Sequence, residues 1–369
     1  MADEIPALRA AAIVSAKPPI HSGGGRRGRS DPGDRRARAA MAAKIAGGLL
    51  IATVIYCAIY TLVFCAAAIL YARGVVVNAP WILMVQRELY LNGGWNVWQA
   101  QPGCVEFDEK LIYKPSIGTC RFANMEFNTI LNFTSAGRMT GEMQSPAKSI
   151  AVLGDSFAMG WGVDDTDTFA AELQRRTGRK VYNLAVSSYG TIRELMRLST
   201  FEQLGTVDTV IIQYCDNDRE ENLHFTIPSA AEAKRKFAAI TALRHSDRWF
   251  LFKYYYRSYK ATIWYPIVEL CRRALHNTEP EDFTPHYETL MQVIRHSDAL
   301  KGKQVIVFYS RGYAVKFRNF PVGKDHETDN VTFVDVPLGQ EDFYVLDPHL
   351  NKLGHQLIGQ TLADALQEP

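Results

Sequence analysis

The alternation of apolar and polar segments along residues 146–369 predicts strands and helices in turn. Short apolar runs, typical of buried strands, occur at residues 149–154, 181–186, 209–215, 304–310 and 331–336. Residues 167–178, 190–205 and 351–367 instead place apolar positions at helical spacing. Strands that alternate with helices indicate a parallel sheet covered on both faces. We therefore expect an α/β fold, a doubly wound, flavodoxin-like, five-stranded parallel sheet sandwiched by helices.

The interval between the third and fourth predicted strands, about residues 216–300, is too long for a plain crossover. We expect a helical insertion there. Residues 248–275, RWFLFKYYYRSYKATIWYPIVELCRRAL, are aromatic and basic at helical spacing. This segment fits a substrate wall or a membrane-facing surface, and it fits equally an ordinary helix with solvated Lys and Arg side chains.

A long apolar segment precedes this region. No charged residue lies between Lys44 and Arg73, and this length exceeds the roughly 20 residues that a membrane-spanning helix needs. The apolar part of a cleaved signal peptide is shorter, about 7–15 residues. We predict one transmembrane anchor over residues 45–72. It is followed by a lead-in region, 73–145, whose early aromatic residues fit a membrane interface or a packed core: Trp81, Tyr90, Trp95 and Trp98.

The charge distribution sets the expected orientation. Residues 1–44 hold nine Lys and Arg against four Asp and Glu, while the whole chain has a net charge of +2, so the remainder is mildly acidic. An acidic body gives no reason to expect nucleic acid as a partner. The tail, rich in Gly, Arg and Ala, should be disordered. Because basic residues favour the cytoplasmic side, we expect the tail in the cytoplasm. The domain after residue 73 would then lie outside, in the periplasm or at the surface if the anchor lies in a bacterial inner membrane.

The chain contains six cysteines. Cys104 and Cys120 fall in the predicted exported part, where a disulfide can persist, but sequence alone leaves their pairing open because it gives no distances. Cys57 and Cys65 belong to the apolar anchor. Cys215 and Cys271 have no partner at metal-ligand spacing, so we interpret both as structural and expect no metal site.

Polar residues follow four of the predicted strands, at the edge where open α/β sheets bind ligands. Gly154-Asp155-Ser156 follows the first strand, and residues 187–190, Ser-Ser-Tyr-Gly, follow the second. Residues 216–218, Asp-Asn-Asp, follow the third, and Asp347 with His349 comes after the fifth. Together they offer a nucleophile, hydrogen-bond donors for an oxyanion, and a base with a group that orients it.

These four motifs resemble those of the SGNH hydrolase superfamily, also called GDSL-type esterases and lipases, over roughly residues 146–365. The resemblance implies that Ser156, in GDSF, is the nucleophile, and that Asp347 and His349, in DPHLNKLGH, complete a catalytic triad. It also implies an oxyanion hole formed by the backbone N–H groups of Ser156 and Ser188 and by the side chain of Asn217.

The chain departs from the family pattern at three points. Ser188 and Cys215 stand where the family has glycine, and the Asp-x-His spacing is one residue shorter than the common one. Gly154, Asp155 and Gly190 are expected to support the loops of the site, with Asp155 fixing its turn. We assign His355 to helix packing.

The resemblance implies acyl transfer without a metal or another cofactor. We predict a serine-dependent ester hydrolase, an O-deacylase that acts outside the membrane on acylated envelope or extracellular glycans. The expected location, rather than any residue, motivates this substrate. Two alternatives stay open: an O-acyltransferase of the same fold in polysaccharide modification, and a non-catalytic glycan-binding or scaffold domain.

Overall fold

The computed structural model describes residues 32–94, 96–143, 148–242, 248–265, 267, 280–314, 316–325 and 327–367. The chain divides into two compact units, Met1–Cys65 and Ala66–Pro369. The second unit contains the sheet and all the predicted site residues. Cys271 and Trp95, discussed above, lie outside the described residues.

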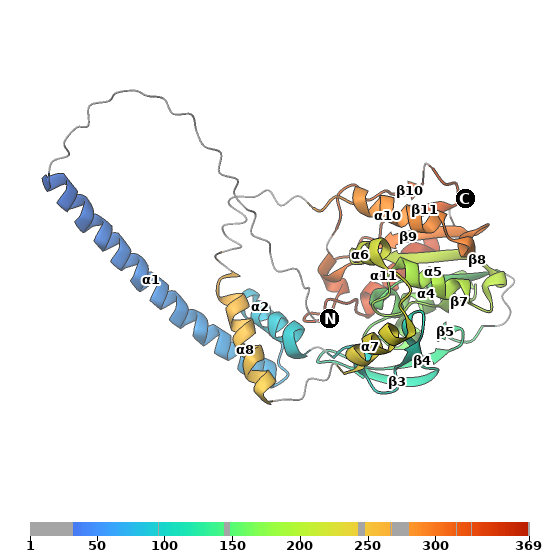
Figure 1. The fold of residues 1–369 in the computed structure, drawn as a ribbon, viewed down its shortest axis with the longest axis horizontal. Coiled ribbons are helices and arrows are strands. Elements are labelled where there is room, and N and C mark those ends of the chain that lie inside the picture. Colours follow the sequence, from blue (N-terminus) through green and yellow to red (C-terminus); the bar gives the residue numbers. More distant parts are fainter. Residues whose placement is uncertain are drawn as a thin grey trace, which may run out of the picture. The chain divides into compact units, whose positions relative to one another are not determined.

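Within the described residues, a mixed sheet of nine strands forms the centre of the second unit, in the order β10-β11-β9-β8-β6-β7-β5-β4-β3 (Figure 1). These strands are β3 (Gly118–Ala123), β4 (Asn128–Thr134), β5 (Gly137–Arg138), β6 (Ser149–Leu153), β7 (Val181–Asn183), β8 (Val207–Tyr214), β9 (Gln304–Tyr309), β10 (Gly323–Lys324) and β11 (Val331–Val334). A hairpin of β1 (Val105–Asp108) and β2 (Ile112–Pro115) forms a separate two-stranded sheet.

The sheet is larger than the predicted five-stranded one, and it is not purely parallel. The neighbours β11, β9, β8, β6 and β7 run parallel and occupy the five apolar runs. The antiparallel strands β3, β4 and β5 come from residues that we expected to be a separate lead-in region. β4 alternates exposed and buried side chains along its length. This pattern suits an antiparallel strand with one solvated face, and it lacks the continuous apolar run of a buried parallel strand.

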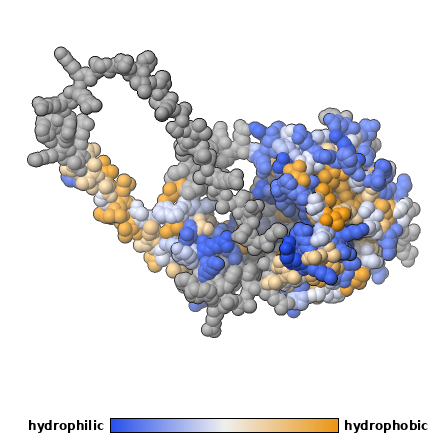
Figure 2. Space-filling view, in the orientation of Figure 1, coloured by the Kyte–Doolittle hydropathy of each residue, from blue (hydrophilic) through white to orange (hydrophobic). Residues whose placement is uncertain are grey.

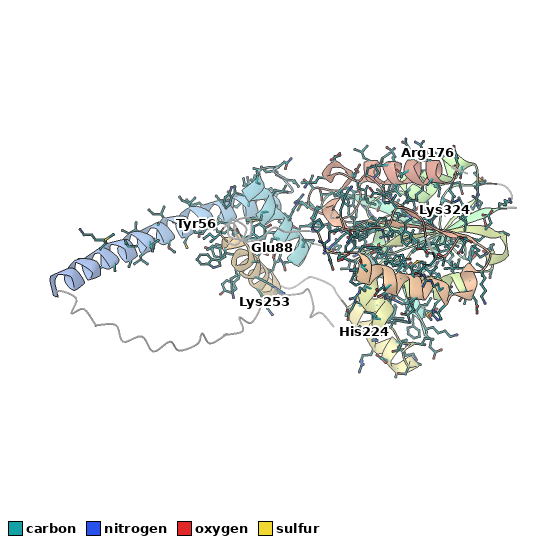
Figure 3. All side chains as sticks on the ribbon, turned by 90° about the horizontal axis from the view of Figure 1, so that it is seen from above. Tyr56, Glu88, Arg176, His224, Lys253 and Lys324 are labelled. Atoms are coloured by element: carbon teal, nitrogen blue, oxygen red, sulfur yellow. A yellow bond between two sulfur atoms is a disulfide. The ribbon has the colours of Figure 1, made fainter. Side chains whose placement is uncertain are left out.

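Helices cover both faces of the parallel strands. α4 (Phe169–Thr177) and α11 (Lys352–Ala365) pack together on one face, and α5 (Thr191–Ser199) and α10 (Thr284–Arg295) lie on the other. Figure 3 shows α11 and α10 on opposite sides of the sheet. Along β6, Ile150 and Val152 join the first core cluster while Ala151 and Leu153 join the second. Burial of each larger apolar side chain contributes about 1.5–3 kcal/mol.

The described part of the expected insertion, residues 216–300, is mostly helical. It holds α6 (Asp218–His224), α7 (Ala230–Thr241), α8 (Arg248–Ile263) and α10. α8 packs against α2 (Pro80–Leu89). The other described helical pieces are α3 (Ser156–Met159), the π-helical turn η1 (Tyr90–Gly94), and the 3₁₀ turns η2 (Trp98–Ala100), η3 (Asp165–Asp167), η4 (Leu204–Thr206), η5 (Asp298–Leu300), η6 (Gly312–Ala314) and η7 (Gln340–Asp342).

The first helix, α1 (Pro32–Ala72), contains one stretch, Ala40–Ala72, that is long and apolar enough to cross a membrane. Figure 2 shows apolar residues along its surface. α1 begins before the predicted anchor, so residues 32–44, which we expected to be disordered, are helical. Proline suits the first position of a helix, and the Arg and Ala residues that follow are good helix formers.

The structure settles two points that the sequence left open. Cys104 and Cys120 form a disulfide, with their Cα atoms 5.1 Å apart. It joins the turn before β1 to β3. Tyr90 and Trp98 are fully buried, so these two aromatic residues pack in the core. Trp81 is half exposed.

Candidate active site

Strand β6 leads directly to Ser156. The chain turns at Gly154, where φ is 145° and an added Cβ would lie 2.6 Å from Cβ of Ala158. Only glycine fits this turn. Asp155 Oδ1 then accepts a hydrogen bond from the backbone N–H of Phe157 at 2.8 Å and caps α3, whose first residue is Ser156. The sequence therefore holds the serine at the carboxyl end of a central strand.

The structure brings Ser156, His349 and Asp347 into one hydrogen-bonded chain. Nε2 of His349 lies 2.7 Å from Oγ of Ser156, and Nδ1 of His349 lies 2.6 Å from Oδ1 of Asp347. The backbone N–H of His349 also donates to Oδ1, at 3.0 Å. With the Nδ1 proton facing the carboxylate, the lone pair of Nε2 faces Ser156 and can accept the serine proton. The shorter Asp-x-His spacing is therefore compatible with triad geometry.

Asp347 is fully buried and surrounded by donors. Its Oδ2 accepts hydrogen bonds from the Tyr90 hydroxyl and, at 3.2 Å, from Nε1 of Trp161. Burial alone would raise the pKa of Asp347, but the nearby His349 and hydrogen bonds from His349 and Tyr90 outweigh it and hold the pKa below its ordinary value. Asp347 therefore stays ionised and can stabilise an imidazolium.

Several residues that the sequence did not identify shape the triad. The Trp161 indole stacks on the His349 ring, with centroids 4.5 Å apart and planes 14° apart. The carboxylate of Glu126 accepts the backbone N–H groups of residues 345, 346 and 347 at 2.7–2.8 Å. Trp161 follows the GDSF motif closely in sequence and could have been noticed there. Glu126 and Tyr90 carry no such signal.

A cavity of about 420 Å³ opens over the nucleophile. It is lined by Ser156 and His349, by the predicted oxyanion residues Ser188 and Asn217, and by Arg311. A second cavity, of about 510 Å³, is larger but lies among other residues, including Lys180 and Tyr182. It contains no member of the triad, so the smaller cavity is the candidate active site.

The Ser188 loop is held in an unusual conformation. Ser188 has φ of 63°, in the left-handed region that favours glycine, which is the residue that the family pattern described above has at this position. Its hydroxyl accepts a hydrogen bond from Nε2 of Gln99 at 2.9 Å.

Glu221 Oε1 accepts hydrogen bonds from the Gly190 N–H at 3.0 Å and from Nε of Arg193 at 2.8 Å. The loop is thus tied to α6, the helix that follows Asn217.

Buried acids lie beneath this side of the site. Burial, followed by repulsion from neighbouring carboxylates, raises the pKa values of Glu194 and Asp218 well above their ordinary values. Burial also raises the pKa of Asp155. Asp218 Oδ2 accepts the backbone N–H of Cys215 at 3.1 Å, so it anchors its own turn. In the described part of the chain, no group of three or more His, Cys, Asp or Glu residues could hold a metal ion.

His355 lies outside the triad. It is fully buried, its Nδ1 accepts the backbone N–H of Phe169 at 3.2 Å, and burial lowers its pKa to about 3. The prediction that it serves helix packing is confirmed.

Comparison with known proteins gives structural likeness at low sequence identity. No family model matches the chain, and no curated protein is similar to it in sequence. A lipolytic G-D-S-L family member from Veillonella parvula is 12% identical, with 60% of this chain and all of the other covered, at a TM-score of 0.33. A carbohydrate acetylesterase family member from Sinorhizobium meliloti is 12% identical, covering 59% and 97% at a TM-score of 0.31. A carbohydrate esterase family 2 enzyme from Corynascus thermopiles is 14% identical, covering 62% and 68% at a TM-score of 0.27.

Proposed function

We propose that this chain is a serine-dependent ester hydrolase. One observation carries the proposal: Oγ of Ser156, both ring nitrogens of His349 and Oδ1 of Asp347 form a continuous hydrogen-bonded chain at the floor of a cavity. Residues with a purely structural role seldom place a serine at the end of a strand, next to a base and a buried carboxylate that orients the base. The arrangement supports acyl transfer through a covalent intermediate.

The reaction would begin when Ser156 Oγ attacks the ester carbonyl carbon and passes its proton to His349 Nε2. Asp347 holds the imidazole and stabilises its positive charge. The backbone N–H groups of Ser156 and Ser188 and the amide of Asn217 would stabilise the carbonyl oxygen as it becomes negative. The bond to the leaving alcohol then breaks and the alcohol takes the proton from His349. Water attacks the acyl group on Ser156 in the same way and releases the carboxylic acid.

We further propose that the enzyme acts outside the membrane, with residues 45–72 as a single-pass anchor and the N-terminus in the cytoplasm. The apolar helix and the basic residues before it support this orientation. The Cys104–Cys120 disulfide supports an oxidising compartment such as the periplasm. An acylated envelope or extracellular glycan is the substrate class that fits this location.

The proposal is tested with the full chain purified in detergent and assayed with p-nitrophenyl acetate. Wild-type protein should release p-nitrophenol, while Ser156→Ala and His349→Ala should each lose at least about 10³-fold in kcat. Mass spectrometry after treatment with a fluorophosphonate should find the label on Ser156. Turnover that survives Ser156→Ala, or a label on another residue, would contradict the assignment.

The same assay separates the two alternatives. Labelling of Ser156 with little hydrolysis, but with acyl transfer to an added sugar, would indicate an O-acyltransferase, which uses the same acyl-enzyme with a hydroxyl in place of water. An unlabelled Ser156 would favour a non-catalytic glycan-binding or scaffold domain.

A further inference from the structure

The segment that follows the membrane helix α1 forms hydrogen bonds within itself, ahead of the first strand of the sheet. We call α2 and η1, residues 80–94, the arm. Gln86 of the arm is fully buried; its Nε2 donates to the carbonyl of Val75 at 2.8 Å and its Oε1 accepts from the N–H of Val77 at 3.0 Å. The short linker between α1 and α2 is therefore held against the arm.

The arm also contacts the loop that carries Asp347. The Tyr90 hydroxyl donates to Asp347 Oδ2, and Nε of Arg87 donates to the carbonyl of Val345 at 2.7 Å. The Arg87 guanidinium lies 4.3 Å above the ring of Tyr313, and the Tyr313 hydroxyl donates to the carbonyl of Leu346 at 2.6 Å. Tyr313 itself lines the active-site cavity. Arm residues thus hold the triad loop at two points directly and at a third through Tyr313.

Helix α8 also packs against the arm. The Tyr254 hydroxyl donates to the carbonyl of Leu89, and its ring lies so close to Gly93 that an added Cβ would be 2.6 Å from it. Figure 3 labels Glu88 on α2 and Lys253 on the neighbouring α8. The aromatic insertion helix therefore has a structural role, which is to hold the arm in place.

The chemistry of Tyr90 suits a donor to a carboxylate. Tyr90 is fully buried, and its burial, followed by the Asp347 charge, raises the pKa of the phenol far above its ordinary range. The phenol therefore stays protonated and donates at every working pH. A hydrogen bond to Oδ2 leaves Oδ1 facing Nδ1 of His349, which fixes the rotation of the carboxylate.

We propose that the membrane-proximal arm is part of the catalytic machinery, with Tyr90 as a positioning residue for Asp347. The inference rests on the proposed function, since it needs a working triad. The segment that anchors the enzyme and the segment that completes its active site are then one piece of chain, so catalysis depends on docking of the arm.

The test compares Tyr90→Phe with Tyr287→Phe in the full chain in detergent. Both variants keep the ring and remove a tyrosine hydroxyl bonded to an aspartate, but the partner of Tyr287 is Asp325, outside the site. The readout is the rate constant for fluorophosphonate labelling of Ser156 as a function of pH. Tyr90→Phe should lower the rate about ten- to hundredfold, the effect expected for losing a hydrogen bond to a charged group, whereas Tyr287→Phe should match wild type.

The pH profile separates positioning from general loss of structure. The groups around Asp347 that bear charge or titrate include His349, Tyr90, Glu126, Tyr313 and Tyr344. Without the Tyr90 hydroxyl, the Asp347 carboxylate keeps more of its negative charge to hold the proton that His349 takes up. The acid limb of the Tyr90→Phe profile should therefore move to higher pH. The position of that limb does not depend on how much of the protein is folded.

Each outcome of this experiment either supports or overturns the role of Tyr90. A lowered rate with a shifted acid limb supports the role of Tyr90. A wild-type profile, or a lower rate with an unmoved limb, would overturn it while leaving the proposed function intact, provided that Ser156 is still labelled. Failure of wild-type protein to label at Ser156 would overturn both proposals, and labelling without hydrolysis would overturn only the hydrolase.

Discussion

Asn217 and Ser188 both line the cavity, and on the proposed mechanism they would give donors of different kinds to the same oxygen. Asn217 offers a side-chain amide, and Ser188 offers a backbone N–H in a loop whose φ is 63°. A backbone donor survives substitution of its side chain, whereas a side-chain donor does not. Substitutions at Asn217 and at Ser188 should therefore have different effects on activity.

Asn217→Ala should lower kcat for p-nitrophenyl acetate by about 10²–10³-fold, the usual cost of losing one oxyanion donor. Ser188→Gly should keep most of the activity, because glycine retains the N–H and adopts a positive φ without strain. Steady-state kinetics of both variants provide the measurement. An equal loss in the two variants would mean that the Ser188 hydroxyl, rather than its N–H, is needed.

At the scale of elements, the arm and α8 form a small assembly beside the sheet. The Tyr254 hydroxyl donates to the Leu89 carbonyl, and the Tyr254 ring packs on Gly93. Because neither Gly93 nor Tyr254 lines the cavity, disturbance of their contact would reach the active site only by moving the arm.

Gly93→Ala should therefore reduce the rate of Ser156 labelling, although residue 93 does not line the cavity. The added methyl group would meet the Tyr254 ring at 2.6 Å, and such overpacking costs about 1–3 kcal/mol. Gly205→Ala is a matched control, since a Cβ at Gly205 has no atom within 4 Å. If both variants label at the wild-type rate, docking of the arm is not required for activity.

The sequence predicted the parallel strands and the positions of the triad because both have local signals. Apolar runs mark β6, β8 and β9, and the motif residues follow at their ends. Strands β3 and β4 lack such runs because they mix exposed and buried side chains, and β5 is only two residues long. Tyr90 could not be identified, since its partner Asp347 lies 257 residues away in the chain. Long-range side-chain pairing is set by packing and not by local pattern.

At the scale of the whole molecule, the buried acids make stability depend on pH. Glu194 is almost fully buried and, among the described residues, neither of its carboxyl oxygens has a hydrogen-bond partner. Its pKa is raised well above the ordinary value by burial first and then by neighbouring carboxylates. The folded state therefore binds a proton that the unfolded state releases, and stability falls as pH rises through the raised pKa.

Glu194→Gln should flatten this dependence, because the amide cannot ionise. Thermal unfolding of the wild type should show Tm falling from mildly acidic to mildly alkaline pH, with a smaller fall in the variant. The charged or titratable neighbours of Glu194 that remain are Asp218, Asp155, Glu221 and Arg193. Glu202→Gln, at an exposed position, is the control. A variant whose Tm falls as steeply as wild type would show that Glu194 does not govern the effect.

The bond between Tyr90 and Asp347 also bears on synthesis of the chain. Asp347 is synthesised 257 residues after Tyr90, and closing so long a loop is entropically costly. Contacts of this span belong to the late steps of folding. A nascent chain that has not reached residue 347 therefore lacks the carboxylate that orients His349. On the proposed mechanism, Ser156 would stay inactive until the loop that carries Asp347 and His349 has been made.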